Sequence, residues 1–210
     1  MEIIIYIVII IVTILLSMTL HEAMHAFTSY WLGDDTAKLQ GRLTLNPIKH
    51  IDPFLTLILP IGLLLVGAPV FGGAKPVPFN PDRVRGGDWG AALVAISGPL
   101  TNFLLAFVTF GVWAIIGAPT TGLAAQVFIT AYTVNLGFFI FNMIPFPPLD
   151  GSRVLYALAP EFVRTAMRTI EQFGVFFVFA LILLASGPIG QFMLAAINFF
   201  LGVFAGIFRV

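Results

Sequence analysis

Cysteine is absent from this chain of 210 residues, and charged side chains are scarce. Without cysteine there can be no disulfide framework and no thiolate chemistry. Charged residues make up 10% of the sequence, whereas an average soluble domain carries about 25%. The formal net charge is zero and no basic tract occurs, so nucleic-acid binding has no support. These shortages point away from a soluble domain and toward a lipid bilayer.

Long apolar runs occupy most of the chain, and hydrophobic residues make up 59% of it. The runs are continuous and do not alternate, which predicts an all-α integral membrane protein and excludes a β-barrel. We expect residues 1–210 to form a single domain, a polytopic helical bundle with about five full spans. The expected spans are residues 3–31, 89–116, 123–147, 170–186 and 190–208.

Two apolar stretches contain helix breakers. An unbroken helix over residues 173–208 would be about 54 Å long, which exceeds a hydrocarbon core of about 30 Å. We therefore predict a tight helical hairpin that turns at residues 186–190. Residues 54–72 form a sixth apolar segment, interrupted by prolines and glycines such as Pro60 and Gly67. This density of breakers predicts a re-entrant or broken segment.

The basic residues indicate an orientation. If residues 54–72 re-enter, all ten Lys and Arg fall on one side of the membrane; if they cross, the basic loops 33–52 and 73–88 lie on opposite sides. The positive-inside rule favours the first arrangement and makes that side the cytoplasm. We then expect the N-terminus outside and the C-terminus inside, in a prokaryotic plasma membrane. The ten are Lys38, Arg42, Lys49, Lys75, Arg83, Arg85, Arg153, Arg164, Arg168 and Arg209.

A polar motif interrupts the first apolar segment. Residues 21–25 read His-Glu-Ala-Met-His, and the chain has only three histidines. On a helix this spacing sets His21 and His25 one turn apart on one face, where both can bind Zn²⁺, with Glu22 beside the ion as general base. Ionisable residues inside a membrane are costly and mark functional sites. The alternative interpretation is a hydrogen-bonded polar pocket of a transporter or scaffold.

Catalytic zinc needs three protein ligands and one open position, so a third ligand must come from elsewhere. The two candidates are His50, in a polar loop, and Asp150, which ends a long apolar segment. In the one-sided topology Asp150 lies at a membrane depth comparable to that of the two histidines. An Asp before Gly is usually a turn or a helix cap. Because the site is otherwise incomplete, we favour Asp150 as the third ligand and expect His50 to orient its loop. A hydrogen bond from His50 that supports one of the zinc ligands stays open as an alternative.

The combination resembles a known family. HEAMHAF on one membrane helix and Asn142-Met-Ile-Pro-Phe-Pro-Pro-Leu-Asp-Gly151 on another are similar to motifs of the site-2 protease family of intramembrane zinc metalloproteases. Further similar stretches are residues 42–53, 73–81 and 97–102, so the resemblance covers about two thirds of the chain. Within these 210 residues we expect no PDZ or CBS domain of the kind that larger members contain.

The resemblance implies one Zn²⁺ per chain bound by His21, His25 and Asp150, with Glu22 as catalytic base. It also implies that Asn142 positions the substrate or stabilises the oxyanion. The substrate would be a transmembrane segment of another protein in the lipid bilayer. The pattern of residues 37–45 is compatible with extended backbone and suggests a short β-hairpin that could pair with an unwound substrate. An ordinary surface turn fits these residues equally well.

The sequence thus predicts a membrane zinc metalloendopeptidase of the regulated intramembrane proteolysis type. Two other classes stay open: a transporter or channel that handles protons or divalent metal through the His/Glu/Asp cluster, and a zinc-binding but inactive scaffold. Whether the chain forms a homo-oligomer or works with an accessory regulator is also open.

Overall fold

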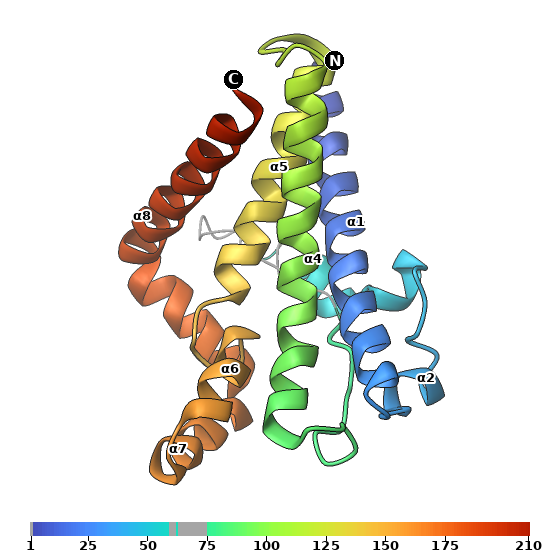
Figure 1. The fold of residues 1–210 in the computed structure, drawn as a ribbon, viewed down its shortest axis with the longest axis vertical. Helices are drawn as coiled ribbons and strands as arrows, with labels where there is room; N and C mark the ends of the chain where they lie inside the picture. Colours follow the sequence, from blue (N-terminus) through green and yellow to red (C-terminus); the bar gives the residue numbers. More distant parts are fainter. Residues whose placement is uncertain (1, 59–61, 63–74) are drawn as a thin grey trace.

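The computed structural model describes residues 2–58, 62 and 75–210, and this part of the chain is helical. Figure 1 shows an elongated bundle in which α1, α4 and α5 run side by side, with α8 beside them and the short helices α2, α6 and α7 at one end. In chain order the helices are α1 (Glu2–Trp31), α2 (Thr36–Leu39), η1 (Pro47–His50), η2 (Pro53–Ile58), α4 (Gly87–Ile115), α5 (Gly122–Asn142), α6 (Gly151–Leu158), α7 (Glu161–Gln172) and α8 (Gly174–Phe208).

Four helices in the described part of the chain are long and apolar enough to cross a membrane: α1, α4, α5 and the Gly187–Phe208 part of α8. Hydrocarbon offers no partners for backbone N–H and C=O groups, so apolar runs of this length satisfy them internally as helices. The prediction of an all-α membrane protein is confirmed. Helix α5 ends at Asn142, earlier than residue 147, because Pro145 disfavours the helical conformation of the residue before it.

The predicted hairpin over residues 170–208 is wrong. Helix α8 runs from Gly174 to Phe208 with Pro188 inside it, and Figure 1 shows one bent helix. A proline removes one backbone hydrogen bond, whereas a turn at residues 186–190 would leave several N–H and C=O groups unpaired in hydrocarbon. Continuing the helix therefore costs less than turning back.

Because α8 is a single helix, both ends of the chain lie at the same end of the bundle (Figure 1). Phe208 packs against Gly111 near the C-terminal end of α4, where an added Cβ would lie 2.6 Å from the Phe208 ring. The predicted placement of the termini on opposite sides is therefore wrong. Of the ten basic residues, Arg209 lies at this end, and the other nine lie in the loops and short helices at the opposite end.

At the opposite end of the bundle the two basic loops lie together. The Lys75 N–H donates to the His50 carbonyl at 2.9 Å. The buried Arg42 guanidinium donates to the carbonyls of Lys49 and Lys75 and so ties one loop to the other. Residues 33–52 and the described part of the second basic loop, residues 75–88, thus share one end, as predicted. The predicted re-entrant course of residues 54–72 lies for the most part outside the described residues.

Residues 37–45 do not form the predicted β-hairpin; Thr36–Leu39 is the helical turn α2, and none of the residues described is in a strand. The fully buried Asp34 explains the turn, because its Oδ1 accepts from the Thr36 N–H at 3.0 Å and from the Thr36 hydroxyl. Its Oδ2 accepts from the Asn80 N–H at 2.6 Å. Burial alone would raise the pKa of Asp34, but these hydrogen bonds hold it below its usual value. Asp34 thereby joins the end of α1 to the segment that follows residue 74.

The half of the bundle nearer the termini has an aromatic core shared by α4, α5 and α8. The Phe204 ring lies 5.2 Å from that of Phe107 and 5.6 Å from that of Phe110, centroid to centroid. The fully or nearly fully buried members are Ala106, Phe110, Tyr132, Leu136, Ile140 and Phe204. This apolar packing holds α4, α5 and α8 together.

Candidate active site

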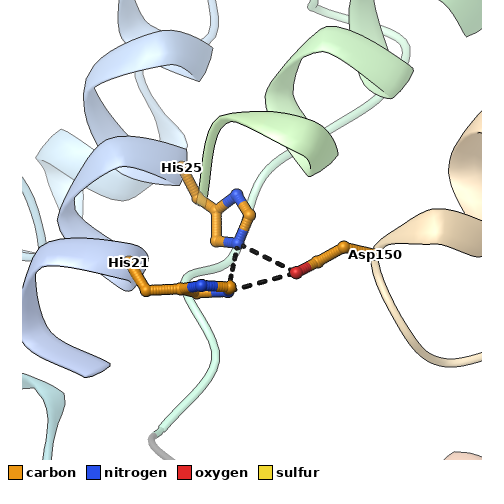
Figure 2. Close-up of side chains that lie close together, drawn as sticks. All are labelled: His21, His25 and Asp150. Atoms are coloured by element: carbon orange, nitrogen blue, oxygen red, sulfur yellow. Dashed lines mark hydrogen bonds and ion pairs between the residues drawn. The ribbon is translucent and has the colours of Figure 1, made fainter. Parts of the chain in front are cut away.

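Three ionisable side chains converge between α1 and the loop before α6 (Figure 2). His21 and His25 lie one turn apart on α1, and their Nε2 atoms are 3.0 Å apart. The Asp150 Oδ2 lies 3.1 Å from His21 Nε2 and 3.5 Å from His25 Nε2. Both histidines are buried, at 7% and 8% exposure. The ligand atoms of this group all lie within 4.8 Å of one another, close enough to hold one metal ion.

Asp150 reaches the histidines because the chain folds tightly after α5. The residue that follows it, Gly151, begins α6 and is pressed against the end of α5. An added Cβ on Gly151 would lie 2.4 Å from the Met143 carbonyl oxygen, so only glycine fits without a shift of backbone. This close approach places the Asp150 carboxylate opposite the imidazoles of α1.

The far side of each imidazole is held by a hydrogen-bond acceptor. His25 Nδ1 lies 2.8 Å from the Val94 carbonyl oxygen, and His21 Nδ1 lies 2.6 Å from the Asn102 Oδ1, both on α4. Oxygens of this kind only accept, so each Nδ1 carries the hydrogen. A ring that carries its hydrogen on Nδ1 alone, which is the form that binds a metal ion, presents its Nε2 lone pair to the other ring and to Asp150.

This arrangement fits a zinc ion. With both rings in that form, the two Nε2 atoms and the Asp150 oxygen are acceptors 3.0–3.5 Å apart, and a cation among them would offset their mutual repulsion. Tetrahedral zinc with bonds of about 2.0–2.1 Å would separate its ligand atoms by about 3.3 Å, within that range. Two histidines that each donate the second ring N–H to an oxygen are the usual pattern of zinc-binding imidazoles. The donor set also leaves a fourth position, as catalytic zinc requires.

The Asp150 carboxylate is in the form that a metal ligand needs. Burial alone would raise its pKa, but the facing His25 and His21 side chains hold the pKa well below its usual range. A metal ligand of this kind must be deprotonated to bind.

Helix α4 approaches the cluster through Gly98. An added Cβ on Gly98 would lie 2.5 Å from His25 Nε2 and 2.7 Å from His21 Nε2, so α4 can approach both imidazoles this closely only because this residue lacks a side chain. In the sequence Gly98 stands among other small residues of an apolar run, a pattern typical of closely packed membrane helices. Its apposition to the two imidazoles depends on the crossing of α1 and α4, which no local pattern reveals.

Glu22 follows His21 on α1 and is held by a different part of the chain. Its Oε2 accepts from the Val77 N–H at 2.8 Å. Val77 belongs to the extended segment after residue 74, which Arg42 anchors through the carbonyls of Lys75 and Pro76. The carboxylate beside the cluster is thus fixed by a backbone hydrogen bond from a segment that is itself tied to the loop at 33–52.

Two other residues singled out in the sequence lie elsewhere. The Asn142 amide donates to the Phe138 carbonyl at 3.0 Å within its own helix, so a role toward substrate remains a prediction. His50 is buried and its Nε2–H donates to the Thr44 carbonyl at 2.9 Å, a contact that orients the loop. Neither belongs to the metal-binding group.

Comparison with known proteins agrees with this geometry. The family model of peptidase family M50 matches residues 114–185. A protein of Bacillus subtilis (strain 168), "Putative zinc metalloprotease YwhC", is 40% identical over 94% of this chain and 91% of its own length. The chain belongs to peptidase family M50, the site-2 proteases. Rip2 of Mycolicibacterium smegmatis, named in the same way, is 30% identical over 92% of this chain and 72% of its own. No solved structure matches the chain significantly.

Membership of family M50 settles the class of activity. The protein is a membrane metalloprotease, and zinc is the metal of its named relatives. The transporter and scaffold interpretations of the His/Glu/Asp cluster therefore have no support beyond the sequence pattern that raised them.

Proposed function

We propose that His21, His25 and Asp150 bind one Zn²⁺ and that Glu22 is the general base for hydrolysis of peptide bonds within or near transmembrane segments of other membrane proteins. The observation that carries the proposal is the convergence of two Nε2 atoms and a carboxylate oxygen within 3.0–3.5 Å. Both histidines lie in the half of α1 nearer the loops. We therefore expect cleavage near that face of the bilayer, and not at its centre.

The chemistry divides between the ion and the chain. Zinc, when bound, supplies a Lewis acid and lowers the pKa of a water to about 7. The Glu22 carboxylate takes a proton from the attacking water and returns it to the leaving nitrogen. Because Oε2 is held by the Val77 N–H, we assign the proton to Oε1. The Val94 carbonyl and the Asn102 amide keep the imidazoles oriented throughout.

The proposal is tested by reconstituting the purified chain in lipid vesicles with a model transmembrane substrate. We expect about one zinc per chain and a substrate cut within or close to its span. Zinc content without any cleavage would favour a scaffold, and flux of protons or divalent metal without cleavage would favour a transporter. Either result would contradict the proposed function.

The basic residues give the proposed orientation. Nine of the ten lie at the end of the bundle that holds the cluster, and Arg209 at the other. By the positive-inside rule the cluster end faces the cytoplasm and both termini face outside. The chain has no native cysteine, so single cysteines are unambiguous probes. In oriented membranes we expect an impermeant thiol reagent applied from outside to label Val210→Cys and to spare Asp82→Cys; the reverse pattern would overturn the orientation.

Asp150→Asn should weaken zinc binding by about 100-fold or more, because an amide is a poor substitute for a carboxylate ligand. Chelator competition with the purified protein measures the affinity. Asp82→Asn is the matched control, since Asp82 is exposed in the loop before α4 and should leave zinc unchanged. Normal zinc affinity in Asp150→Asn would reopen the question of the third ligand.

A further inference from the structure

Behind His21 a chain of hydrogen bonds runs through two buried asparagines on different helices. The His21 Nδ1–H donates to Asn102 Oδ1 at 2.6 Å, and Asn102 Nδ2 donates to Asn135 Oδ1 at 2.9 Å. Asn135 Nδ2 in turn donates to the Ala131 carbonyl at 2.8 Å. Asn102 is 0% exposed and Asn135 is 4% exposed, so water cannot replace these partners. Burying two amides among apolar helices costs free energy, and polar residues kept inside a membrane mark functional sites.

The order of donors along this chain allows one arrangement. The Ala131 carbonyl only accepts, so Asn135 must turn its NH₂ group toward it and its Oδ1 toward α4. Asn102 must then present its own NH₂ group to that oxygen, which turns its Oδ1 toward His21. An oxygen in that place requires a hydrogen on His21 Nδ1 and leaves the lone pair on Nε2.

We propose that Asn102 and Asn135 are positioning residues that together fix the metal-binding tautomer of His21. The proposal rests on the proposed function, in which His21 Nε2 binds zinc. A side-chain amide can present either its oxygen or its NH₂ group, so Asn102 alone would leave the choice of tautomer open. Asn135 removes that freedom without touching His21, because it is the nearer acceptor of the Asn102 NH₂ group, at 2.9 Å against 3.3 Å for the Ser17 carbonyl. The second histidine needs no such device, because the Val94 carbonyl that holds His25 cannot turn around.

A simpler interpretation is that the asparagines only join helices, as buried amides in membrane proteins often do. The two roles use different atoms of Asn102. Helix joining uses its NH₂ group, which donates to Asn135 and to the Ser17 carbonyl at 3.3 Å. Tautomer selection uses its Oδ1. A substitution that keeps one function and removes the other can therefore tell the roles apart.

The test is a double-mutant cycle of zinc affinity on the full chain, measured by chelator competition. Asn102→Leu removes both functions and should weaken zinc binding about 10–100-fold, the range for lost contacts behind a ligand. Asn102→Asp keeps an acceptor for His21 and loses the NH₂ donor, so near wild-type affinity is expected. Asn135→Ala should weaken zinc binding about tenfold in the wild-type background. In the Asn102→Asp background it should have no effect, because both oxygens of a carboxylate accept, whichever way the group is turned.

A second readout follows the tautomer directly. The chain has three histidines, so labelling with ¹⁵N-histidine gives few imidazole signals to assign. We expect the Nδ1–H proton of His21 to be seen in the wild type and in Asn102→Asp, and to be lost or weakened in Asn102→Leu. Thr101→Val is the control and should leave this signal unchanged, since the Thr101 hydroxyl donates to the Ser97 carbonyl within α4.

Wild-type zinc affinity in Asn135→Ala would overturn the proposal. So would an equal loss of affinity from Asn135→Ala in the wild-type and Asn102→Asp backgrounds, or equal losses in Asn102→Asp and Asn102→Leu. If Asn102→Leu does not fold, the Asn135→Ala comparison decides alone. His21→Ala separates this failure from that of the proposed function. If His21→Ala still binds zinc, the proposed ligand set is wrong. If His21→Ala loses zinc while the asparagine variants keep it, only the positioning role of Asn102 and Asn135 is refuted.

Discussion

Glu22→Gln is expected to lower the rate of substrate cleavage by about 10²–10⁴-fold while the protein keeps its zinc. Glutamine has the shape of glutamate and can still accept the Val77 N–H through its amide oxygen, so the local structure should persist. It cannot take a proton from water, which removes the general base. Initial cleavage rates in vesicles and metal content of the same preparation give both quantities.

The control for this prediction is Glu161→Gln, which removes a carboxylate from the exposed surface of α7, where Glu161 pairs with Arg168. It should leave the cleavage rate unchanged. Full activity in Glu22→Gln would contradict the assigned base, and loss of zinc together with activity would show that Glu22 acts on the metal site itself.

Gly98→Ala is expected to remove zinc binding almost completely. The new methyl group would lie 2.5 Å from His25 Nε2 and 2.7 Å from His21 Nε2, the two atoms that would bind the metal, so the imidazoles would have to move. The imidazoles cannot swing away freely, because their Nδ1 atoms are held by Val94 and Asn102. The loss should exceed the ~100-fold upper range found for contacts behind a ligand. Chelator competition measures it.

Gly111→Ala is the matched control, since it adds the same methyl group to the same helix. There the added Cβ would lie 2.6 Å from the Phe208 ring, so overpacking should cost about 1–3 kcal/mol of stability. Zinc affinity should stay at the wild-type level, because this contact is at the far end of α4. Equal zinc affinities in Gly98→Ala and Gly111→Ala would show that the space beside the imidazoles is not needed.

The parts of the site that sequence could predict are those set by local spacing or by depth in the membrane. The i, i+4 spacing places His21 and His25 on one face of any helix. Asp150 could be paired with them because apolar segments fix how far each residue lies along a span. The same reasoning predicted α1, α4 and α5, since continuous apolar runs have few alternatives to a helix in a bilayer.

What sequence could not predict depends on contacts between helices. Whether Pro188 ends a helix or lies within it is decided by the cost of unpaired backbone groups in hydrocarbon, and the prediction chose the turn. Gly98 resembled any small residue in a packed helix, although it faces two imidazoles. Asn102 could be expected to bond across helices, but its partners His21 and Asn135 are 81 and 33 residues away.

The candidate metal centre also joins distant parts of the polypeptide. His21 and Asp150 are 129 residues apart in sequence and 3.1 Å apart in space. An ion shared by them would hold together, in the folded form, two segments separated by more than half of the chain. Binding to the folded form alone would also stabilise it in proportion to the logarithm of the free zinc concentration. In a polypeptide without cysteine, the catalytic ion would thus double as the cross-link that a disulfide supplies elsewhere.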